Sequence, residues 1–244
     1  MPEGPTIVIL REQLAPFTGE KVTAAHGTAR IDLSRLEGQH ITAFKSWGKH
    51  CLICVRGFSI RIHLLMFGSY RINDHKDVAP RIGLTFNDGE INFYTCAVKL
   101  LEGDVNDHYD WTADVMNDNW NARLAKKKLA AIPEQMICDA LLEQDIFSGV
   151  GNIIKNEVLY RVRLHPESLC GSIPDAKLRE LIREARQYSF EFLEWKKKSE
   201  LKKHWLAYTK KTCKRCNLPF AKKYTGTGKR RSFFCAKCQK LHHG

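Results

Sequence analysis

Four cysteines in the last part of the chain constrain its fold more than any other feature. They form two C-x-x-C pairs with eighteen residues between them, Cys213/Cys216 and Cys235/Cys238. Two close pairs of thiolates can complete a tetrahedral shell around Zn²⁺, so the spacing predicts a closed, structural zinc site without an open coordination position. An iron–sulfur cluster or a redox dithiol remains an alternative for the same pattern. We expect residues 222–234 to form a β-hairpin that carries the second pair.

The positive charge of the chain is concentrated in the same part. The sequence has 39 Lys and Arg against 27 Asp and Glu, a formal net charge of +12. Sixteen of these bases and a single acid, Glu200, lie in residues 196–244, which gives this segment +15 and leaves −3 for residues 1–195. Such a segment attracts polyanions. Aromatic residues and cysteine pairs lie among the lysines, which favours a folded nucleic-acid-binding module over a loose basic tail.

Composition sets the broad class of protein. Hydrophobic residues make up 43% of the chain and charged residues 27%, which is typical of a globular protein. No run of eighteen apolar residues occurs, and the first residues lack the pattern of a secretory signal. The cysteines read as metal ligands and core residues rather than as a disulfide framework. We therefore expect a protein of a reducing compartment with no membrane partner. Its expected location is the cytoplasm, in association with the nucleoid if the source is bacterial, and its expected state is a monomer.

The first part of the chain reads as one helix followed by strands. Residues 6–14 place Ile7, Leu10 and Leu14 on one helical face. From about residue 20 to residue 96 the pattern changes to short strands, and residues 82–94 form the clearest hairpin because they alternate on both sides of an Asn-Asp-Gly turn. Several short strands with turn signals predict a β-sandwich.

The second part of the chain reads as helical. Residues 103–118 are polar and lack apolar periodicity, so they are predicted to be a linker. Helices are expected at 125–131, 133–144 and 174–195. The predicted fold class is therefore α+β, with three domains: a β-sandwich with its N-terminal helix, a helical domain and a zinc finger, over residues 1–112, 119–200 and 205–244.

A glycine-containing turn precedes one of these helices. Gly149-Val150-Gly151-Asn152 joins the predicted helix that ends near Gln144 to one that begins near Ile153. Glycines allow a ligand to approach the backbone closely, and the amides at a helix N-terminus bind anions. Gly151 and Asn152 are therefore candidate phosphate-binding residues. The alternative is an ordinary connection in which glycine and asparagine cap two helices.

The second residue of the chain could act as a nucleophile. Removal of Met1 is expected because Pro2 is small, and it would expose a secondary amine with a pKa of about 8. Such an amine can attack a sugar aldehyde carbon and form an iminium, and Glu3 beside it could transfer protons. The alternative is that Pro2 and Glu3 only mark the start of a helix.

These motifs occur together in one known family. Pro2-Glu3-Gly4-Pro5 at the start, Gly48-Lys49 on an early strand, Gly149-Val150-Gly151-Asn152 and the four-cysteine finger appear in this order. The chain thus resembles the formamidopyrimidine-DNA glycosylase/endonuclease VIII (Fpg/Nei) family over nearly its whole length. The resemblance implies a β-sandwich domain, a helix-two-turn-helix domain with the zinc finger, and binding of damaged double-stranded DNA.

The resemblance also implies roles for individual residues. Pro2 would be the Schiff-base nucleophile, Glu3 the proton donor to the deoxyribose, and Lys49 a catalytic lysine that contacts phosphate. Asn152 with Gly151 would hold phosphate. On the finger hairpin, Arg230 would bind phosphate and assist the second elimination. The loop at residues 63–68 would supply the apolar side chain that fills the gap left by the flipped base, and Met66 is the candidate.

The implied function is that of a DNA repair enzyme. It would be a bifunctional DNA glycosylase/AP lyase of base excision repair that removes oxidised bases and cleaves the strand by β,δ-elimination. Thr6 stands where many members carry glutamate. Residues 94–100 lack the wedge residues of the formamidopyrimidine branch, and the connection between the long helix and Cys213 is short. Both features favour oxidised pyrimidines as substrates. The alternatives are an 8-oxoguanine/formamidopyrimidine glycosylase of the same family and a non-catalytic zinc-ribbon DNA-binding protein.

Overall fold

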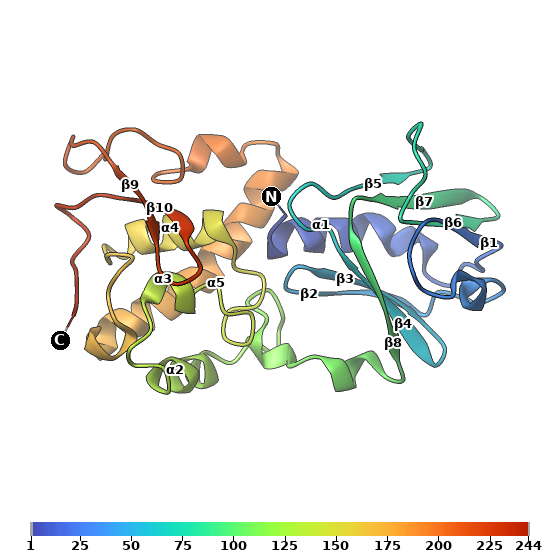
Figure 1. Ribbon diagram of the computed structural model, residues 1–244, viewed down its shortest axis with the longest axis horizontal. Helices are drawn as coiled ribbons and strands as arrows, with labels where there is room; N and C mark the ends of the chain where they lie inside the picture. Colours follow the sequence, from blue (N-terminus) through green and yellow to red (C-terminus); the bar gives the residue numbers. More distant parts are fainter. Residues whose placement is uncertain (1, 244) are drawn as a thin grey trace. The chain divides into compact units, whose positions relative to one another are not determined.

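The protein consists of two compact units, each described here by itself. The structure is a computed structural model that describes residues 2–243 (Figure 1). The first unit ends at Asp110 and the second begins at Trp111. The first is built mainly of strands and the second mainly of helices, so the predicted α+β class is confirmed. In residues 2–243 no helix combines the length and the apolar character needed to cross a bilayer.

The first unit places one helix and two antiparallel sheets around one apolar core. Its helix is α1 (Gly4–Leu14). It begins two residues earlier than predicted, because Pro5 fits the first turn of a helix. One sheet has the order β1-β6-β7-β5 and the other β2-β3-β4-β8. The strands are β1 (Ala24–His26), β2 (Ala43–Trp47), β3 (His50–Val55), β4 (Phe58–His63), β5 (Ser69–Ile72), β6 (Ile82–Phe86), β7 (Gly89–Tyr94) and β8 (Ala97–Glu102).

The core of this unit comes from all three layers. Ile7 and Leu10 of α1, Ile53 and Ile60 of one sheet, and Phe93 of the other are fully buried in the same cluster. The side chains of each strand alternate between this core and the opposite face, as expected for a sheet with one face on a core. The predicted β-sandwich with its N-terminal helix is thus confirmed, and so is the β6–β7 hairpin.

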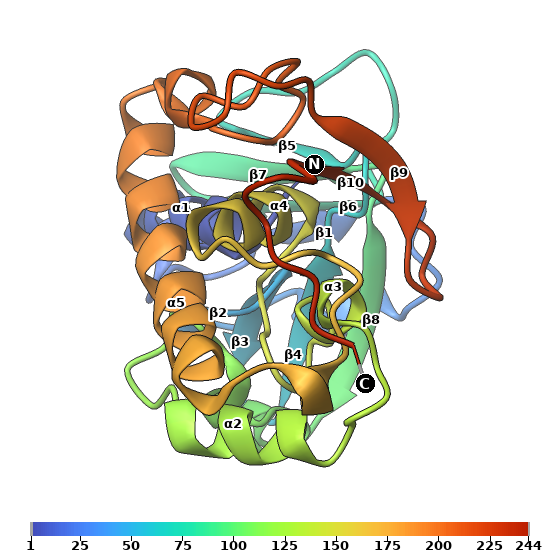
Figure 2. The ribbon, with the colours of Figure 1, turned by 90° about the vertical axis from the view of Figure 1, so that its left-hand side faces the viewer.

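The second unit contains four α-helices and a two-stranded hairpin. The helices are α2 (Ala122–Ala130), α3 (Ile137–Ala140), α4 (Asn152–Arg161) and α5 (Asp175–Lys197). Strands β9 (Ala221–Thr225) and β10 (Arg230–Phe234) form the hairpin expected between the cysteine pairs. Viewed end-on, α4 lies between α5 and the hairpin (Figure 2). Short 3₁₀ helices connect these elements, η5 (Cys170–Ser172) and η6 (Leu201–His204) among them.

Two predictions of local structure are wrong. The helix expected over residues 133–144 is reduced to α3, because Met136 has an extended backbone and pairs with Leu169 as an isolated bridge. The segment expected to be a linker, residues 103–118, is ordered: η3 (Val105–His108) and η4 (Trp111–Ala113) lie in it. The three predicted domain ranges, 1–112, 119–200 and 205–244, stay a prediction.

Candidate metal centre and nucleic-acid interface

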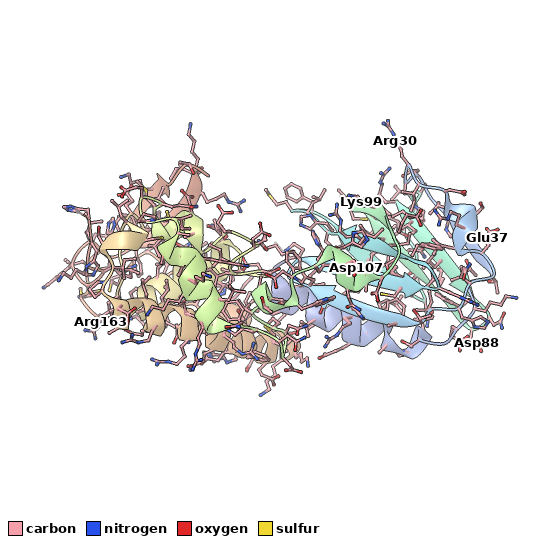
Figure 3. All side chains as sticks on the ribbon, turned by 90° about the horizontal axis from the view of Figure 1, so that it is seen from below. Arg30, Glu37, Asp88, Lys99, Asp107 and Arg163 are labelled. Carbon is pink, nitrogen blue, oxygen red and sulfur yellow. The ribbon has the colours of Figure 1, made fainter. Side chains whose placement is uncertain are left out.

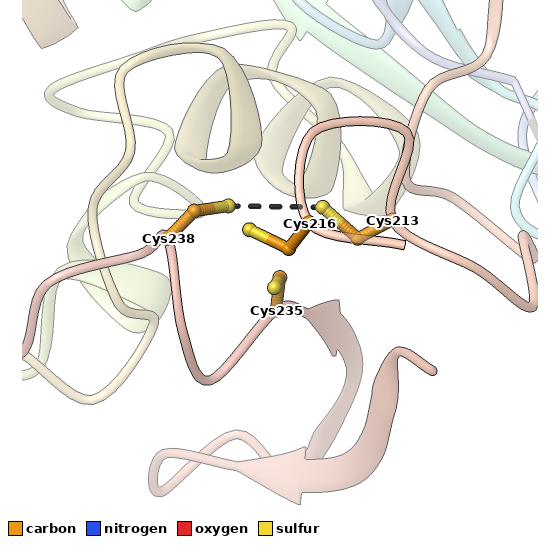
Figure 4. Close-up of side chains that lie close together, drawn as sticks. All are labelled: Cys213, Cys216, Cys235 and Cys238. Atoms are coloured by element: carbon orange, nitrogen blue, oxygen red, sulfur yellow. Dashed lines mark hydrogen bonds between the residues drawn. The ribbon is translucent and has the colours of Figure 1, made fainter. Parts of the chain in front are cut away.

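The four cysteines meet at one point in the second unit. The Sγ atoms of Cys213, Cys216, Cys235 and Cys238 all lie within 4.8 Å of one another, and those of Cys213 and Cys238 are 3.8 Å apart (Figure 4). A tetrahedral zinc with Zn–S bonds of about 2.3 Å has S–S edges of about 3.8 Å. The donor set and its spacing therefore fit a structural zinc ion.

Polar groups of α4 and of the finger lie next to these sulfurs. The Tyr160 hydroxyl is 3.4 Å from the Cys213 Sγ, and the Arg215 guanidinium donates to the Cys238 Sγ at 3.7 Å. The same guanidinium lies 4.0 Å over the Tyr160 ring and donates to the Tyr160 carbonyl at 2.8 Å. Hydrogen bonds and positive charge near thiolates stabilise their ionised form, which is the form that binds metal.

A buried carboxylate holds the chain that leads into the finger. Glu157 of α4 is fully buried, and its two oxygens accept the backbone N–H groups of Leu206, Ala207 and Tyr208 at 2.7–2.9 Å. Burial raises the pKa of Glu157, although these three hydrogen bonds and the positive charge of Arg161 act in the opposite direction. The chain is thus attached to α4 a few residues before the first cysteine pair.

The hairpin is docked on α4 through hydrogen bonds to β10, most of them to one carbonyl group. The Arg231 carbonyl accepts the side-chain amides of Asn152 at 3.0 Å and Asn156 at 3.3 Å, and the Lys155 ammonium at 3.4 Å. Lys155 also donates to the Ser232 hydroxyl at 2.9 Å. Three side chains from successive turns of α4 therefore fix β10, and with it Arg230, against the first half of the helix.

The turn of the hairpin is held from another helix. The carboxylate of Asp139 in α3 accepts the N–H of Thr227 at 2.7 Å, its hydroxyl at 3.1 Å and the N–H of Gly228 at 3.4 Å. Gly226 has a φ of +72°, and a Cβ on it would collide with the same carboxylate. The turn that precedes Arg230 is therefore shaped by a close approach that requires glycine.

The predicted phosphate-binding residues lie at the start of α4, with one difference from the expectation. Gly151 is the N-cap and Asn152 the first residue of the helix. Asn152 is 5% exposed, and its amide N–H₂ is engaged by the Arg231 carbonyl; among residues 2–243 no group pairs with its buried Oδ1. Its side chain therefore joins the helix to the hairpin, and the backbone amides at the N-terminus are the groups suited to an anion.

In the first unit, Pro2 and Glu3 lie directly before α1. Pro2 is half-buried, and the buried Glu3 is the N-cap, with its carbonyl accepting the N–H of Thr6 at 2.9 Å. The α1 helix packs on β2 and β3. The nitrogen proposed as nucleophile is thus attached to a helix that is fixed on a sheet.

Lys49 lies in the turn between β2 and β3, not on a strand as predicted. Trp47 pairs with His50 across that turn, so Gly48 and Lys49 alone connect the strands, and Gly48 takes a φ of +52°. Burial, together with the positive charges of Arg61 and Lys49, lowers the pKa of His50 to about 3. Burial likewise lowers the pKa of His63, whose ring centre is 5.1 Å from that of His50. Burial and the nearby positive charge of Lys49 thus favour the neutral form of both imidazoles.

The apolar loop that follows β4 is exposed. Met66 is 55% exposed, and its neighbours Leu65 and Phe67 are 48% and 80% exposed. A core role for Met66, which is the ordinary role of methionine, does not fit these values. Leu65 also has a φ of +53°, so the loop is tightly turned.

Sequence reasoning did not identify Asp139, Lys155, Asn156 or Glu157. The sequence did contain a signal for the last three, because Lys-Asn-Glu stands between apolar residues in the α4 sequence. In a helix that is buried on all sides, polar and charged side chains of this kind must be paired. Asp139 left no comparable signal, because its partners lie almost ninety residues further along the chain.

Comparison with known proteins agrees with this arrangement. Residues 1–97 match the family described as the formamidopyrimidine-DNA glycosylase N-terminal domain, and residues 112–202 match its H2TH domain. The DNA-(apurinic or apyrimidinic site) lyase Nei2 of Mycolicibacterium smegmatis is 32% identical over 186 residues, which cover 72% of this chain and 72% of that protein. The chain belongs to the Fpg/Nei family. The H2TH match covers α2 to α5 and so includes the GVGN turn.

Two further relatives extend this comparison. Endonuclease 8-like 3 of Xenopus laevis is 29% identical over 232 residues, which cover 90% of this chain but only 38% of the frog protein. The chain thus spans little more than a third of the length of that Fpg/Nei relative. Among solved structures, the Lactococcus lactis formamidopyrimidine-DNA glycosylase bound to DNA with an AP site superposes with a TM-score of 0.85 at 21% identity, covering 98% and 99% of the two chains. That likeness shows a shared fold.

Proposed function

We propose that this protein is a bifunctional DNA glycosylase/AP lyase of base excision repair. The observation that carries the proposal is Pro2, the second residue of the sequence, placed directly before a helix that is fixed on a sheet in a unit of the Fpg/Nei family. Removal of Met1 would convert its nitrogen to a secondary amine. The names of the curated relatives, Endonuclease 8-like 3 and Nei2 among them, support the same class of activity.

The chemistry follows from that amine. The Pro2 nitrogen attacks C1′ of the damaged nucleotide, and the base leaves with the electrons of its glycosidic bond and takes up a proton. The C1′–O4′ bond then opens to give an iminium, while Glu3 supplies the proton that O4′ receives. The iminium acidifies C2′, so loss of a C2′ proton expels the 3′ phosphate, and a second elimination expels the 5′ phosphate. Hydrolysis releases the sugar remnant and restores the amine.

The other candidate residues would bind and position the DNA. Lys49 would contact a phosphate near the lesion and assist the first steps. The N-terminus of α4 at Gly151 and Asn152 would hold a second phosphate. Arg230, fixed by the hairpin, would bind phosphate and assist the second elimination. Met66, on its exposed loop, would fill the space left by the flipped base.

The four cysteines would hold a zinc ion with a structural role. A closed four-thiolate site stabilises the finger when the metal is bound and leaves no position for substrate. In this proposal, Asp139 and Glu157 keep the hairpin and the chain around the finger in place, and Arg230 is the finger residue that meets the DNA.

Oxidised pyrimidines in double-stranded DNA are the substrates that we propose. The curated relatives carry endonuclease 8 names, and the chain lacks the residues expected at positions 94–100 in the formamidopyrimidine branch. Comparing excision of thymine glycol with excision of 8-oxoguanine tests this choice: faster release of 8-oxoguanine would contradict it.

Borohydride trapping tests the central step. Reduction of the iminium in the presence of an oligonucleotide with an abasic site is expected to join the protein covalently to DNA, and peptide mapping is expected to place the adduct on Pro2. Pro2→Thr, which keeps a processable terminus, should abolish the adduct.

Two controls make the result interpretable. Pro2→Thr should still bind the same DNA, which separates loss of chemistry from loss of binding. Lys127→Ala, an exposed lysine of α2, should leave trapping unchanged. If the correctly processed protein binds damaged and undamaged duplex alike and gives no adduct, the protein is a non-catalytic zinc-ribbon DNA-binding protein and the proposal fails.

A further inference from the structure

A groove in the second unit is not used by the proposed chemistry. It is lined by residues of α2 and α5 and by Trp120, has a volume of about 650 Å³, and is formed entirely by residues of the second unit. Five of its ten lining residues are Arg or Lys, and none is acidic. A groove of this size is in the range of ligand sites, and its charge identifies the kind of ligand.

The floor of the groove is apolar. Ile182 is buried beneath it, while Phe190 is 38% exposed at one end. Trp120 forms another part of the floor and packs on the buried Phe147 ring with centroids 5.9 Å apart. Exposed aromatic surface that is fixed on a core is typical of sites that receive an apolar side chain.

The rims of the groove are cationic. Arg179, Arg183 and Arg186 follow one another on α5 at i, i+4 and i+7, so they lie along one face, and Arg123 and Lys126 occupy successive turns of α2. Positive side chains from two helices therefore line the groove, three on α5 and two on α2.

These cations are only partly neutralised within the unit. Lys126 and Arg179 share one carboxylate, that of Asp175. Arg186 is held by the carbonyls of Val115 and Asn117 and lies 5.1 Å over the Phe190 ring, but no acid pairs with it in the described hydrogen bonds and ion pairs. The groove therefore keeps an excess of positive charge for a ligand.

We propose that this groove binds an acidic amphipathic peptide segment of a partner protein. Its apolar side chains would pack on Trp120 and Phe190, and its carboxylates would pair with the arginines of the two rims. A groove between two helices suits helix-in-groove recognition, in which apolar anchors recur every three or four residues. A DNA duplex presents phosphates to such rims but no apolar side chain to the floor. The proposal is independent of the Schiff-base chemistry.

Fluorescence anisotropy with the full chain tests the proposal. The probe is a fluorescein-labelled synthetic helix with Glu on one face and Leu and Phe on the other, and the reference is a scrambled peptide of identical composition. The amphipathic peptide is expected to bind more tightly at physiological ionic strength. Arg123→Glu with Arg183→Glu should weaken its binding by about tenfold or more.

A matched double variant separates local contacts from overall charge. Lys127→Glu with Lys196→Glu makes the same charge change on the same two helices at exposed positions outside the groove, and it should weaken binding by less than about twofold. Phe190→Ser should remove the preference for the amphipathic peptide over the scrambled one. Circular dichroism and zinc content check folding, and Arg→Gln replacements serve if the Glu variants do not fold.

A photo-crosslink locates the bound peptide. A benzophenone at the central apolar anchor is expected to label residues 120–126 or 179–190. Labelling confined to residues 205–243, equal weakening by the two double variants, or no preference for the amphipathic peptide would each overturn the proposal. If the groove variants weaken binding of a short undamaged duplex as much as they weaken peptide binding, the groove is a nucleic-acid site and the peptide proposal is also wrong.

Discussion

The two units keep their structure by different means. In the first, backbone hydrogen bonds close within two antiparallel ladders and the core is almost wholly apolar. In the second, side chains must satisfy backbone groups of loops, of the hairpin and of the finger. Among residues 2–243, four buried polar or charged residues belong to the first unit and twelve to the second. Since a buried polar group is costly only when its partner is lost, the second unit should be far more sensitive to single polar substitutions.

The two units also hold the candidate site residues in different ways. Lys49 lies in a tight turn whose geometry follows from the pairing of β2 with β3, and Met66 lies on the short loop by which the chain passes from β4 of one sheet to β5 of the other. Arg230 lies on a hairpin of only two strands, which is marginal alone, and Asn152, Asn156, Asp139 and the finger hold it in place. Four experiments test this contrast, and the one with the largest expected effect comes first.

Loss of the zinc site should affect one unit and spare the other. Structural zinc sites contribute about 10–16 kcal/mol of apparent binding free energy in small zinc peptides. Cys235→Ser, or treatment with a strong chelator, is therefore expected to remove amide protection from β9, β10 and residues 206–208. Protection in β2–β4 should remain. Hydrogen exchange measured by mass spectrometry reads both regions in one experiment.

A second buried cysteine provides the control for that experiment. Cys170 is 2% exposed and lies outside the four-cysteine cluster. Cys170→Ala should keep the zinc and lower the free energy of unfolding by only about 1–2 kcal/mol. Equal loss of protection in both units of Cys235→Ser would contradict the contrast between them.

Removal of the buried carboxylate of α4 should give the next largest effect. Glu157→Ala leaves three backbone N–H groups without their acceptor and is expected to lower the free energy of unfolding by about 3 kcal/mol or more. The exposed Glu194 of α5 is the matched control, and Glu194→Ala should change stability by less than about 0.5 kcal/mol. Denaturant titration at neutral pH measures both.

The two hairpin turns allow a direct comparison between the units. Asp139→Ala removes the acceptor of the Thr227 and Gly228 amides and should cost about 1–3 kcal/mol and speed amide exchange in residues 226–229. Asp88 lies in the β6–β7 turn, at the periphery of its unit (Figure 3). Asp88→Ala should change stability by less than about 0.5 kcal/mol. A similar loss of stability in the two variants would contradict the contrast, because both turns would then depend equally on their aspartate.

The smallest effect is a dependence on pH. Burial raises the pKa of Glu157 in the folded state, so the folded protein binds this proton more tightly than the unfolded chain does. The stability that this tighter proton binding adds is fully present below the ordinary carboxyl pKa of about 4.3. It is lost as the pH rises through the raised pKa of the folded state. Glu157→Gln cannot titrate. The stability of the wild type relative to this variant should therefore fall from acid to neutral pH, and an unchanged difference would contradict the assignment.

The first unit was largely predictable from the sequence. The alternation on both sides of Asn87-Asp88 fixed β6 and β7 to within a residue, because the period of two and the turn chemistry agree. Pro5 and the apolar spacing located α1. The turn that holds Lys49 was not recognised, because Gly48-Lys49 lacks the Asn-Gly or Asp-Gly pair that marks most two-residue turns.

The second unit was less predictable for a physical reason. Residues 133–144 have helical spacing, yet Met136 pairs with Leu169 and the Ile137 amide donates to the Ser168 carbonyl, so tertiary pairing overrides local propensity. The four cysteines could be found because their spacing is local. Asp139 could not, because the turn that it holds becomes its neighbour only in the folded chain.

The short connection between β2 and β3 limits where such a chain can accept insertions. With only Gly48 and Lys49 between paired strands, one inserted residue would slip the whole of β3 and turn its core side chains outward. The position of the Lys49 amine is therefore determined by the pairing of β2 with β3. The stretch between β5 and β6, residues 73–81, can lengthen or shorten without such a penalty. Changes in length are therefore expected in longer loops of this kind, while the Gly48-Lys49 turn keeps its length.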